Sequence, residues 1–151
     1  MLALVLLSGC ANKHEPGYFD QTVQASDMVL TYLSENNAEG IKELFCSRAK
    51  ELPDIDEQIQ GMLDYFDGKM VSYDKKVVER TSYSKDDYVL TEISAYGQIG
   101  GIVTDTGKEY TELYVFYCAI NVRQPDLVGI YKIVIEAADG TESKIGITTQ
   151  Y

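Results

Sequence analysis

The side chains that could do chemistry are mainly tyrosines, because the 151 residues contain 12 Tyr and a single His. Four of them, Tyr96, Tyr114, Tyr117 and Tyr131, fall in segments that read as strands. A buried Tyr can donate a hydrogen bond to a ligand oxygen, and a neutral Asp beside it could assist acid–base catalysis. A plain preference of aromatic residues for strands is the alternative interpretation. We treat the four as candidate pocket residues.

No catalytic set accompanies these tyrosines. The expected helices and strands contain no His and no isolated acidic residue at a core-facing position of the best strands. A poised acid–base group is what general catalysis requires. The sequence therefore predicts no catalytic residue and favours binding over an enzymatic role.

Two cysteines, Cys46 and Cys118, are a candidate disulfide. Cys46 falls in an expected helix and Cys118 in the middle of the strongest expected strand, so the two could meet in the core. Export from the cytoplasm would permit a bridge, whereas two reduced thiols packed as small apolar groups is the favoured interpretation. Neither has the partner His that a nucleophilic role would need.

The charge balance restricts the partners. With 24 acidic and 13 basic residues, the formal net charge is −11, which disfavours nucleic acid and electrostatic docking on anionic lipid. The acidic cluster of Asp54, Asp56 and Glu57 lacks the alternate spacing of a calcium loop. We expect no metal and no cofactor.

The most specific pattern lies at the start of the chain. Residues 2–7 are an apolar run that ends in Ser8, Gly9 and Cys10, which is typical of an export signal. The run is too short for a membrane span, which needs about 20 residues. Residues 7–10 (LSGC) resemble the lipobox of bacterial lipoproteins. The resemblance implies lipidation at Cys10 and a lipid-anchored location at the cell membrane, facing outside the cytoplasm.

No Lys or Arg precedes the apolar run, although export signals normally begin with a positive segment. We therefore interpret residues 1–9 as a lipoprotein signal segment that is truncated or whose start is placed too far downstream. The alternative is a buried N-terminal strand with Cys10 in the core. Residues 10–17, which include the single His14, are expected to be the lipidated Cys and a flexible spacer. Residues 18–151 are expected to form one domain.

The elements that must position these side chains follow from periodicity. Apolar residues at helical spacing predict helices over residues 19–34, 38–50 and 55–66, the second capped by Asn37. After Gly68, β-like runs separated by turn signals predict strands over residues 70–73, 76–83, 88–102, 110–122, 129–137 and 144–149. Helices followed by an antiparallel sheet of four to six strands is an α+β arrangement.

Three N-terminal helices followed by a bent antiparallel sheet are similar to the nuclear transport factor 2-like, or cystatin-like, cone. More narrowly, the chain resembles small Gram-positive lipoproteins grouped as domain of unknown function family 5104. This resemblance is carried by the lipobox at Cys10, by residues 63–69 (LDYFDGK) running into 71–73 (VSY), and by residues 124–131 (QPDLVGIY). It extends over the mature chain from about Phe19. It implies a fold and a surface location but no activity.

Three functions remain open. The first is a membrane-anchored extracytoplasmic module that binds a small ligand, a peptide or another envelope protein without catalysis. The second is an isomerase- or dehydratase-like enzyme of the cone superfamily that uses pocket Tyr and Asp. The third is a toxin-neutralising, immunity-type protein with a basic partner. Convergent ionisable groups in a pocket would favour the enzyme. A flat exposed sheet face would suit a homodimer, by analogy with other cone proteins.

Overall fold

The computed structural model describes residues 17–148, so the signal segment, Cys10 and His14 lie outside the described residues. Within that range the chain folds as α+β, with the helices first and the sheet after them. The helices are α1 (Tyr18–Ser34), α2 (Ala38–Leu44), α3 (Ser47–Lys50) and α4 (Ile55–Tyr65). None of the helices in the described part is long and apolar enough to cross a membrane.

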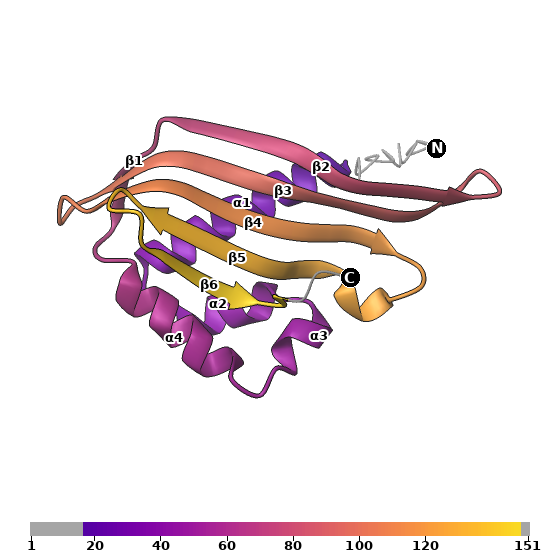
Figure 1. Cartoon of the computed structure of the whole chain (residues 1–151), viewed down its shortest axis with the longest axis horizontal. Helices are drawn as coiled ribbons and strands as arrows, with labels where there is room; N and C mark the ends of the chain where they lie inside the picture. The colour runs from indigo at the N-terminus through magenta and orange to yellow at the C-terminus, as the bar shows by residue number, and fades with distance from the viewer. Residues whose placement is uncertain (1–16, 149–151) are drawn as a thin grey trace, which may run out of the picture.

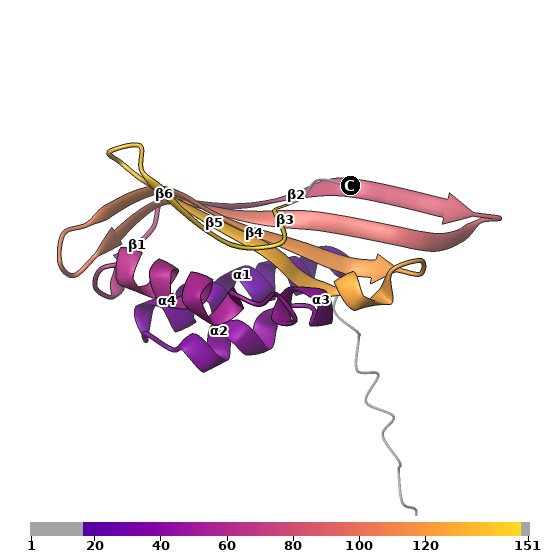
Figure 2. The same cartoon turned by 60° about the horizontal axis from the view of Figure 1, so that its bottom comes forward.

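Six antiparallel strands form one sheet. They are β1 (Met70–Ser72), β2 (Lys75–Asp86), β3 (Val89–Thr104), β4 (Glu109–Asn121), β5 (Gly129–Ala137) and β6 (Glu142–Gly146). The strand order is β1-β3-β4-β5-β6, and β2 pairs with the same edge of β3 as β1. A 3-10 turn, η1 (Pro125–Leu127), joins β4 to β5. The sheet forms one layer and the helices the other (Figures 1 and 2), as the α+β prediction requires.

Helix α1 packs lengthwise under the centre of the sheet, because Val29, Leu30 and Leu33 share its buried face. Each such side chain contributes about 1.5–3 kcal/mol when it is fully buried. Nearer the start of the helix, Ser26 is buried and its hydroxyl donates to the backbone carbonyl of Thr22 at 2.8 Å. A Cβ at Gly97 would overlap the Ser26 hydroxyl. The glycine therefore lets α1 approach β3 closely.

The prediction of one continuous helix over residues 38–50 is wrong, because the helix is interrupted at Phe45. Asn37 caps α2 as predicted, accepting from the Gly40 N–H at 2.8 Å. Phe45 then adopts an extended conformation and forms a parallel bridge with Ile130 of β5, and the Cys46 N–H donates to the Ile130 carbonyl at 2.8 Å. Pairing with the start of β5 ends the helix, and α3 begins only at Ser47.

The strands match the prediction in number and order but differ in their ends. Strand β5 has the predicted bounds, whereas β2 and β3 are longer, because they turn at Asp87 and Tyr88 instead of over residues 84–87. Both turn residues have positive φ, at 45° and 66°. Strand β6 covers Glu142–Gly146 rather than residues 144–149.

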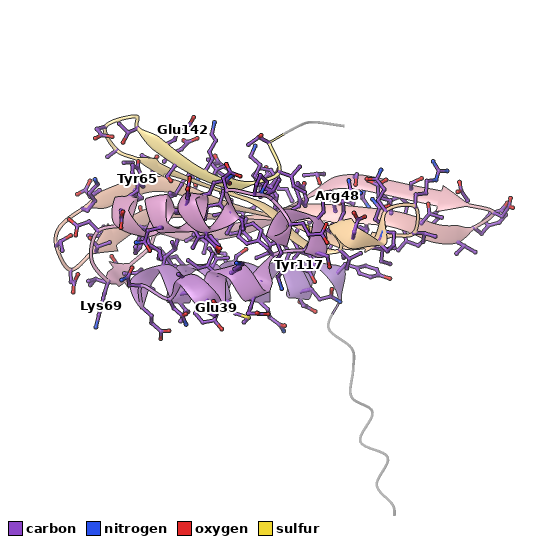
Figure 3. All side chains as sticks on the ribbon, turned by 90° about the horizontal axis from the view of Figure 1, so that it is seen from below. Glu39, Arg48, Tyr65, Lys69, Tyr117 and Glu142 are labelled. Carbon is purple, nitrogen blue, oxygen red and sulfur yellow. The ribbon has the colours of Figure 1, made fainter. Side chains whose placement is uncertain are left out.

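Tyr110 connects the sheet to the end of α4. Its ring is 1% exposed and stacks on Phe66 with ring centroids 5.0 Å apart. Its hydroxyl donates to the Tyr65 carbonyl at 2.8 Å and accepts from the Asp67 N–H at 2.8 Å. In Figure 3, which looks onto the helices from below, Tyr65 and Arg48 lie toward opposite ends of the helical layer. Tyr110 thus fixes the end of that layer that lies away from Arg48.

Candidate functional site

The sheet has an inner face toward the helices and an outer face that α1 does not cover. Side chains alternate between the two, so Ala95 and Val115 point inward while Ser94, Phe116 and Cys118 point outward. A row of small residues crosses the outer side of four strands, because Ser82 pairs with Ser94, Ser94 with Cys118, and Cys118 with Gly129. Small side chains leave space above a sheet, and this row underlies a pocket.

The pocket has a volume of about 510 Å³, within the range of small-molecule sites, about 300–1,000 Å³. Three parts of the chain enclose it: the outer face, the β4–β5 connection with η1, and the residues that follow β6. The lining residues are Thr81, Ser82, Glu92, Ser94, Phe116, Cys118, Asn121, Gln124, Leu127, Tyr131, Lys132, Ile147 and Thr148. The lining combines apolar, hydroxyl, amide and charged groups.

One wall of the pocket is aromatic. The rings of Phe116 and Tyr131 lie 6.0 Å apart by their centroids. The Tyr131 hydroxyl forms a hydrogen bond with Thr81, and burial raises the pKa of this phenol above its ordinary value. Tyr131 follows Gly129 at a point where the register between β4 and β5 shifts. This irregularity turns its ring over the hollow.

Two oppositely charged side chains line the pocket without pairing. Glu92 of β3 accepts a hydrogen bond from the Ser82 hydroxyl at 2.6 Å. The Lys132 ammonium of β5 lies 5.2 Å from the centroid of the Phe116 ring, and among the described residues no carboxylate lies within ion-pair distance of it. The pocket therefore offers a negative charge on β3 and a positive charge on β5, with strand β4 between them.

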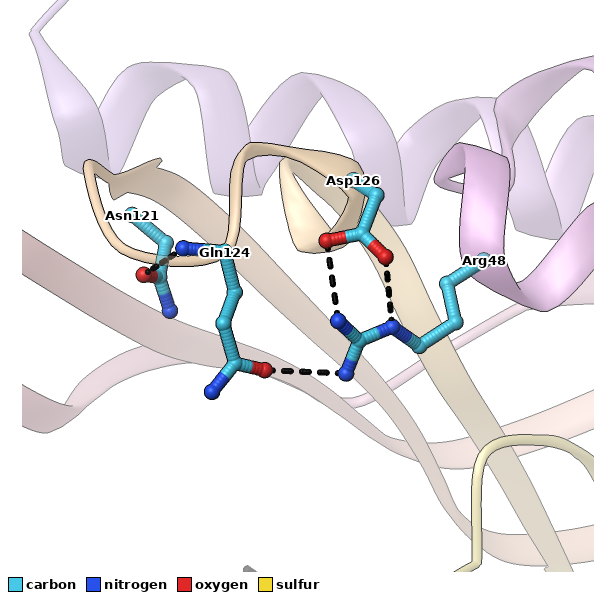
Figure 4. A network of polar contacts seen from close by, with 4 residues as sticks. All are labelled: Arg48, Asn121, Gln124 and Asp126. Carbon is cyan, nitrogen blue, oxygen red and sulfur yellow. Dashed lines mark hydrogen bonds and ion pairs between the residues drawn. The ribbon is translucent and has the colours of Figure 1, made fainter.

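The rim of the pocket is held to the helical layer by Arg48 of α3. Its guanidinium donates to both carboxylate oxygens of Asp126, at 2.7 and 2.9 Å, and to the Gln124 side-chain oxygen at 2.9 Å (Figure 4). Asn121 accepts from the Gln124 N–H at 2.9 Å. The hydrogen bonds from Arg48 hold the pKa of Asp126 below its ordinary value. The paired hydrogen bonds between Arg48 and Asp126 fix η1, so the rim of the pocket has a defined position.

Cys118 lies on the pocket floor, and Cys46 lies on the far side of Gly129. A Cβ at Gly129 would come within 3.2 Å of the Cys46 backbone, while Cys118 is the registered partner of Gly129 on β4. Both cysteines are buried and form no disulfide in the structure. Burial raises the pKa of each thiol above its ordinary value. The disulfide between them stays a prediction.

The four candidate tyrosines divide between the two faces. Tyr131 lines the pocket, and Tyr96 and Tyr114 share its outer face, with ring centroids 5.9 Å apart. The Tyr96 hydroxyl donates to Glu79 at 2.6 Å, and this bond raises the pKa of Tyr96. Tyr117 lies on the inner face instead, where its hydroxyl contacts the Gln21 side chain of α1 at 3.3 Å. The structure thus places three of the four on the outer face, and of these Tyr131 lines the pocket.

Sequence reasoning missed Glu92, Lys132 and the floor of small residues. Polar residues at outward positions of a strand read as ordinary surface, so no local signal singled them out. The available signal was the row of small outward-facing residues on neighbouring strands. These residues can be recognised as neighbours only when the register between the strands is known. Among residues 17–148, no group of three or more His, Cys, Asp or Glu residues is placed to hold a metal ion.

Comparison with protein families gives a match over most of the chain. A model of the family described as Domain of unknown function (DUF5104) matches residues 28–145, which cover all four helices in whole or part and the sheet up to β6. The chain belongs to the DUF5104 family. No curated protein matches it. The matched range includes the floor, the Arg48 contact and the charged pair of the pocket, so these belong to the DUF5104 domain itself.

Proposed function

We propose that this DUF5104 domain is a membrane-anchored, extracytoplasmic binding module whose outer-face pocket holds a small ligand. The observation that carries the proposal is the pocket of about 510 Å³ with Glu92 and Lys132 on separate strands around a floor of small side chains. Pockets that combine apolar walls with a few polar groups are the usual sites for small molecules. The LSGC pattern ending at Cys10 supports the anchor.

The two charges define the class of ligand. Strands β3 and β5 are separated by β4, so their backbones lie about 10 Å apart. Glu92 pairs with Asn121 and Lys132 with Phe116, five positions away on β4, which adds about 16 Å along the strand. Carboxylate and ammonium groups on a ligand would then bind at points up to roughly 19 Å apart, which matches an extended peptide of about five residues at about 3.5 Å per residue. The amides of Asn121 and Gln124 can bond to peptide groups, and Phe116 can contact an apolar side chain. The proposed ligand is a short peptide with free termini.

The chemistry of the pocket supports binding over catalysis. Burial raises the pKa of the Cys118 thiol and of the Tyr131 phenol, so neither ionises readily near neutral pH, where a nucleophile or base must act. Glu92 and Lys132 do not converge on a common point, because no ion pair joins them and each has a different neighbour. An enzyme would need at least one poised acid–base group.

The superfamily assignment is also a proposal. Helices that precede a six-stranded antiparallel sheet and pack on one of its faces are compatible with the nuclear transport factor 2-like cone. This assignment supports a binding role only by analogy, because such folds carry many functions.

The binding test is calorimetry with the pentapeptide Ala-Ala-Phe-Ala-Ala and its N-acetylated and C-amidated forms. We expect amidation of the carboxyl end to weaken binding by about tenfold, the effect of losing one charge-assisted hydrogen bond. In Lys132→Met the amidated and free peptides should bind equally. Lys144→Met is the matched control, since Lys144 is half-exposed on β6 and pairs with Glu142 outside the pocket. Absence of binding at millimolar peptide, or a Lys132→Met protein that still discriminates, contradicts the proposed ligand.

The anchoring test is intact-protein mass spectrometry on membrane fractions from cells that express the full gene. A mature species that begins at Cys10 and carries acyl mass, and that disappears in Cys10→Ala, supports the anchor. An unmodified soluble chain that retains residues 1–9 contradicts it.

A further inference from the structure

The hairpin of β2 and β3 projects beyond the rest of the molecule (Figures 1 and 2). At its tip Tyr88 is 98% exposed and Val89 is 64% exposed. Tyr88 occupies a turn position with φ 66°, which glycine or asparagine adopts more easily. A bulky residue is unfavourable in this conformation, and such outliers cluster at functional sites. The turn therefore carries an exposed tyrosine ring although its backbone conformation favours a smaller residue.

Other exposed apolar side chains lie toward the same end of the sheet. Tyr18 and Phe19, in the first turn of α1, are 40% and 47% exposed, and Val122, at the end of β4, is 63% exposed. The N–H of Val122 donates to the Thr91 carbonyl next to the hairpin.

The contacts of α1 show that its first residues point toward the hairpin tip. Gln21 contacts Tyr117, the partner of Ala95 on β3. Farther along the helix, Ser34 accepts from the N–H of Met70, the partner of Thr104 at the other end of β3. The direction from Ser34 to Gln21 therefore runs along β3 toward Tyr88.

The length of the chain before α1 fits the projection of the hairpin. Gly17 is seven positions after Cys10, and a chain segment of seven steps reaches at most about 25 Å. Ala95, beside Gln21, is seven positions after the tip at Tyr88, which is about 23 Å in an extended strand. An acyl chain on Cys10 and the ring of Tyr88 can therefore reach the same plane.

The charge distribution favours this end as the one that meets a membrane. The hairpin segment over residues 80–91 contains two basic and two acidic residues and is neutral. The helical segment over residues 35–67 contains nine acidic and three basic residues. Anionic lipid repels the helical segment more strongly than the hairpin.

We propose that the tip of the β2–β3 hairpin docks on the lipid surface, with Tyr88 and Val89 in the head-group layer. This docking rests on the lipid anchor proposed above. Tyrosine suits the interface, because its ring is apolar and its hydroxyl stays in water. The docked hairpin gives the anchored domain a fixed orientation. The pocket then lies close to the membrane, because its lining residue Glu92 is four positions from Tyr88.

The test uses the absence of tryptophan from the sequence. Tyr88→Trp places a single fluorophore at the tip, and Tyr73→Trp places one at the opposite end of β2, where Tyr73 is 41% exposed. Each acylated full-length protein is incorporated into phosphatidylcholine–phosphatidylglycerol vesicles with brominated acyl chains. We expect the emission of Tyr88→Trp to shift to the blue and to be quenched at least twofold more than that of Tyr73→Trp.

Vesicle flotation separates the two ways in which the proposal can fail. If the acylated protein floats with the vesicles but both fluorophores are quenched equally, the anchor stands and the docking is overturned. If the wild-type protein does not float, or floats as well after Cys10→Ala, the anchor is wrong and the docking falls with it.

Discussion

Replacing Tyr110 by phenylalanine removes one oxygen atom and keeps the volume of the ring. The wild-type hydroxyl bonds to the Tyr65 carbonyl and the Asp67 N–H, both at 2.8 Å. Each backbone group loses its partner in Tyr110→Phe, and an unsatisfied polar group in a buried setting costs about 1–3 kcal/mol. Both bonds are only partly buried, so we expect a loss of about 2–4 kcal/mol in the free energy of unfolding.

Urea denaturation at pH 7 measures this loss, with an unchanged slope as evidence that the unfolded state is unaffected. Tyr114→Phe is the control, because the Tyr114 hydroxyl forms no hydrogen bond with the rest of residues 17–148 and lies on the outer face of the same strand. We expect the control to change stability by less than about 0.5 kcal/mol. If Tyr110→Phe costs no more than the control, the idea that this hydroxyl fixes the end of α4 is refuted.

Two further predictions concern the pocket rim and its floor. Arg48 lowers the pKa of Asp126 below the ordinary 3.8, so the carboxylate stabilises the fold above that value and stops doing so as the pH falls through the lowered pKa. Asp126→Asn should therefore melt below the wild type at pH 7, the gap should narrow as the pH falls below 3.8, and a gap that does not narrow in acid would contradict this. Gly129 has φ 121°, and a Cβ added there would lie 3.2 Å from the Cys46 backbone. Gly129→Ala should therefore lower the free energy of unfolding, measured in urea, by about 1–3 kcal/mol. Gly61→Ala, at a helical glycine with nothing within 4 Å, should gain about 0.5–1 kcal/mol, and equal losses at both sites would rule out this account.

Local patterns were enough to predict most of the fold. Strand β5 has its predicted bounds because Ile133 and Ile135 alternate with Lys132 and Val134 between clear turn signals. The break at Phe45 could not be predicted, because its cause is a bridge to Ile130, 85 positions later. Long-range pairing overrides helix propensity there.

The site was less accessible to sequence reasoning than the fold. Tyr131 lines the pocket, whereas Tyr117, which was grouped with it by residue type, faces α1. The register shift between Phe116 and Tyr117 is what sends Tyr131 outward, and such bulges leave no reliable local signature. The floor depends on register across four strands, which single-strand patterns do not contain.

The separation in sequence between the helices and their partners has a consequence for how the chain folds. Gln21 contacts Tyr117 across 96 positions, and Gln58 accepts from the Gly146 N–H across 88. A helix as short as α4 is marginal on its own in water, so we expect it to become stable only once β6, on which it packs, has been synthesised. A topology dominated by such distant contacts folds slowly. We therefore expect the chain to complete its fold only after almost all of it has been synthesised, and an unfolded chain is the form that can be threaded through a membrane pore.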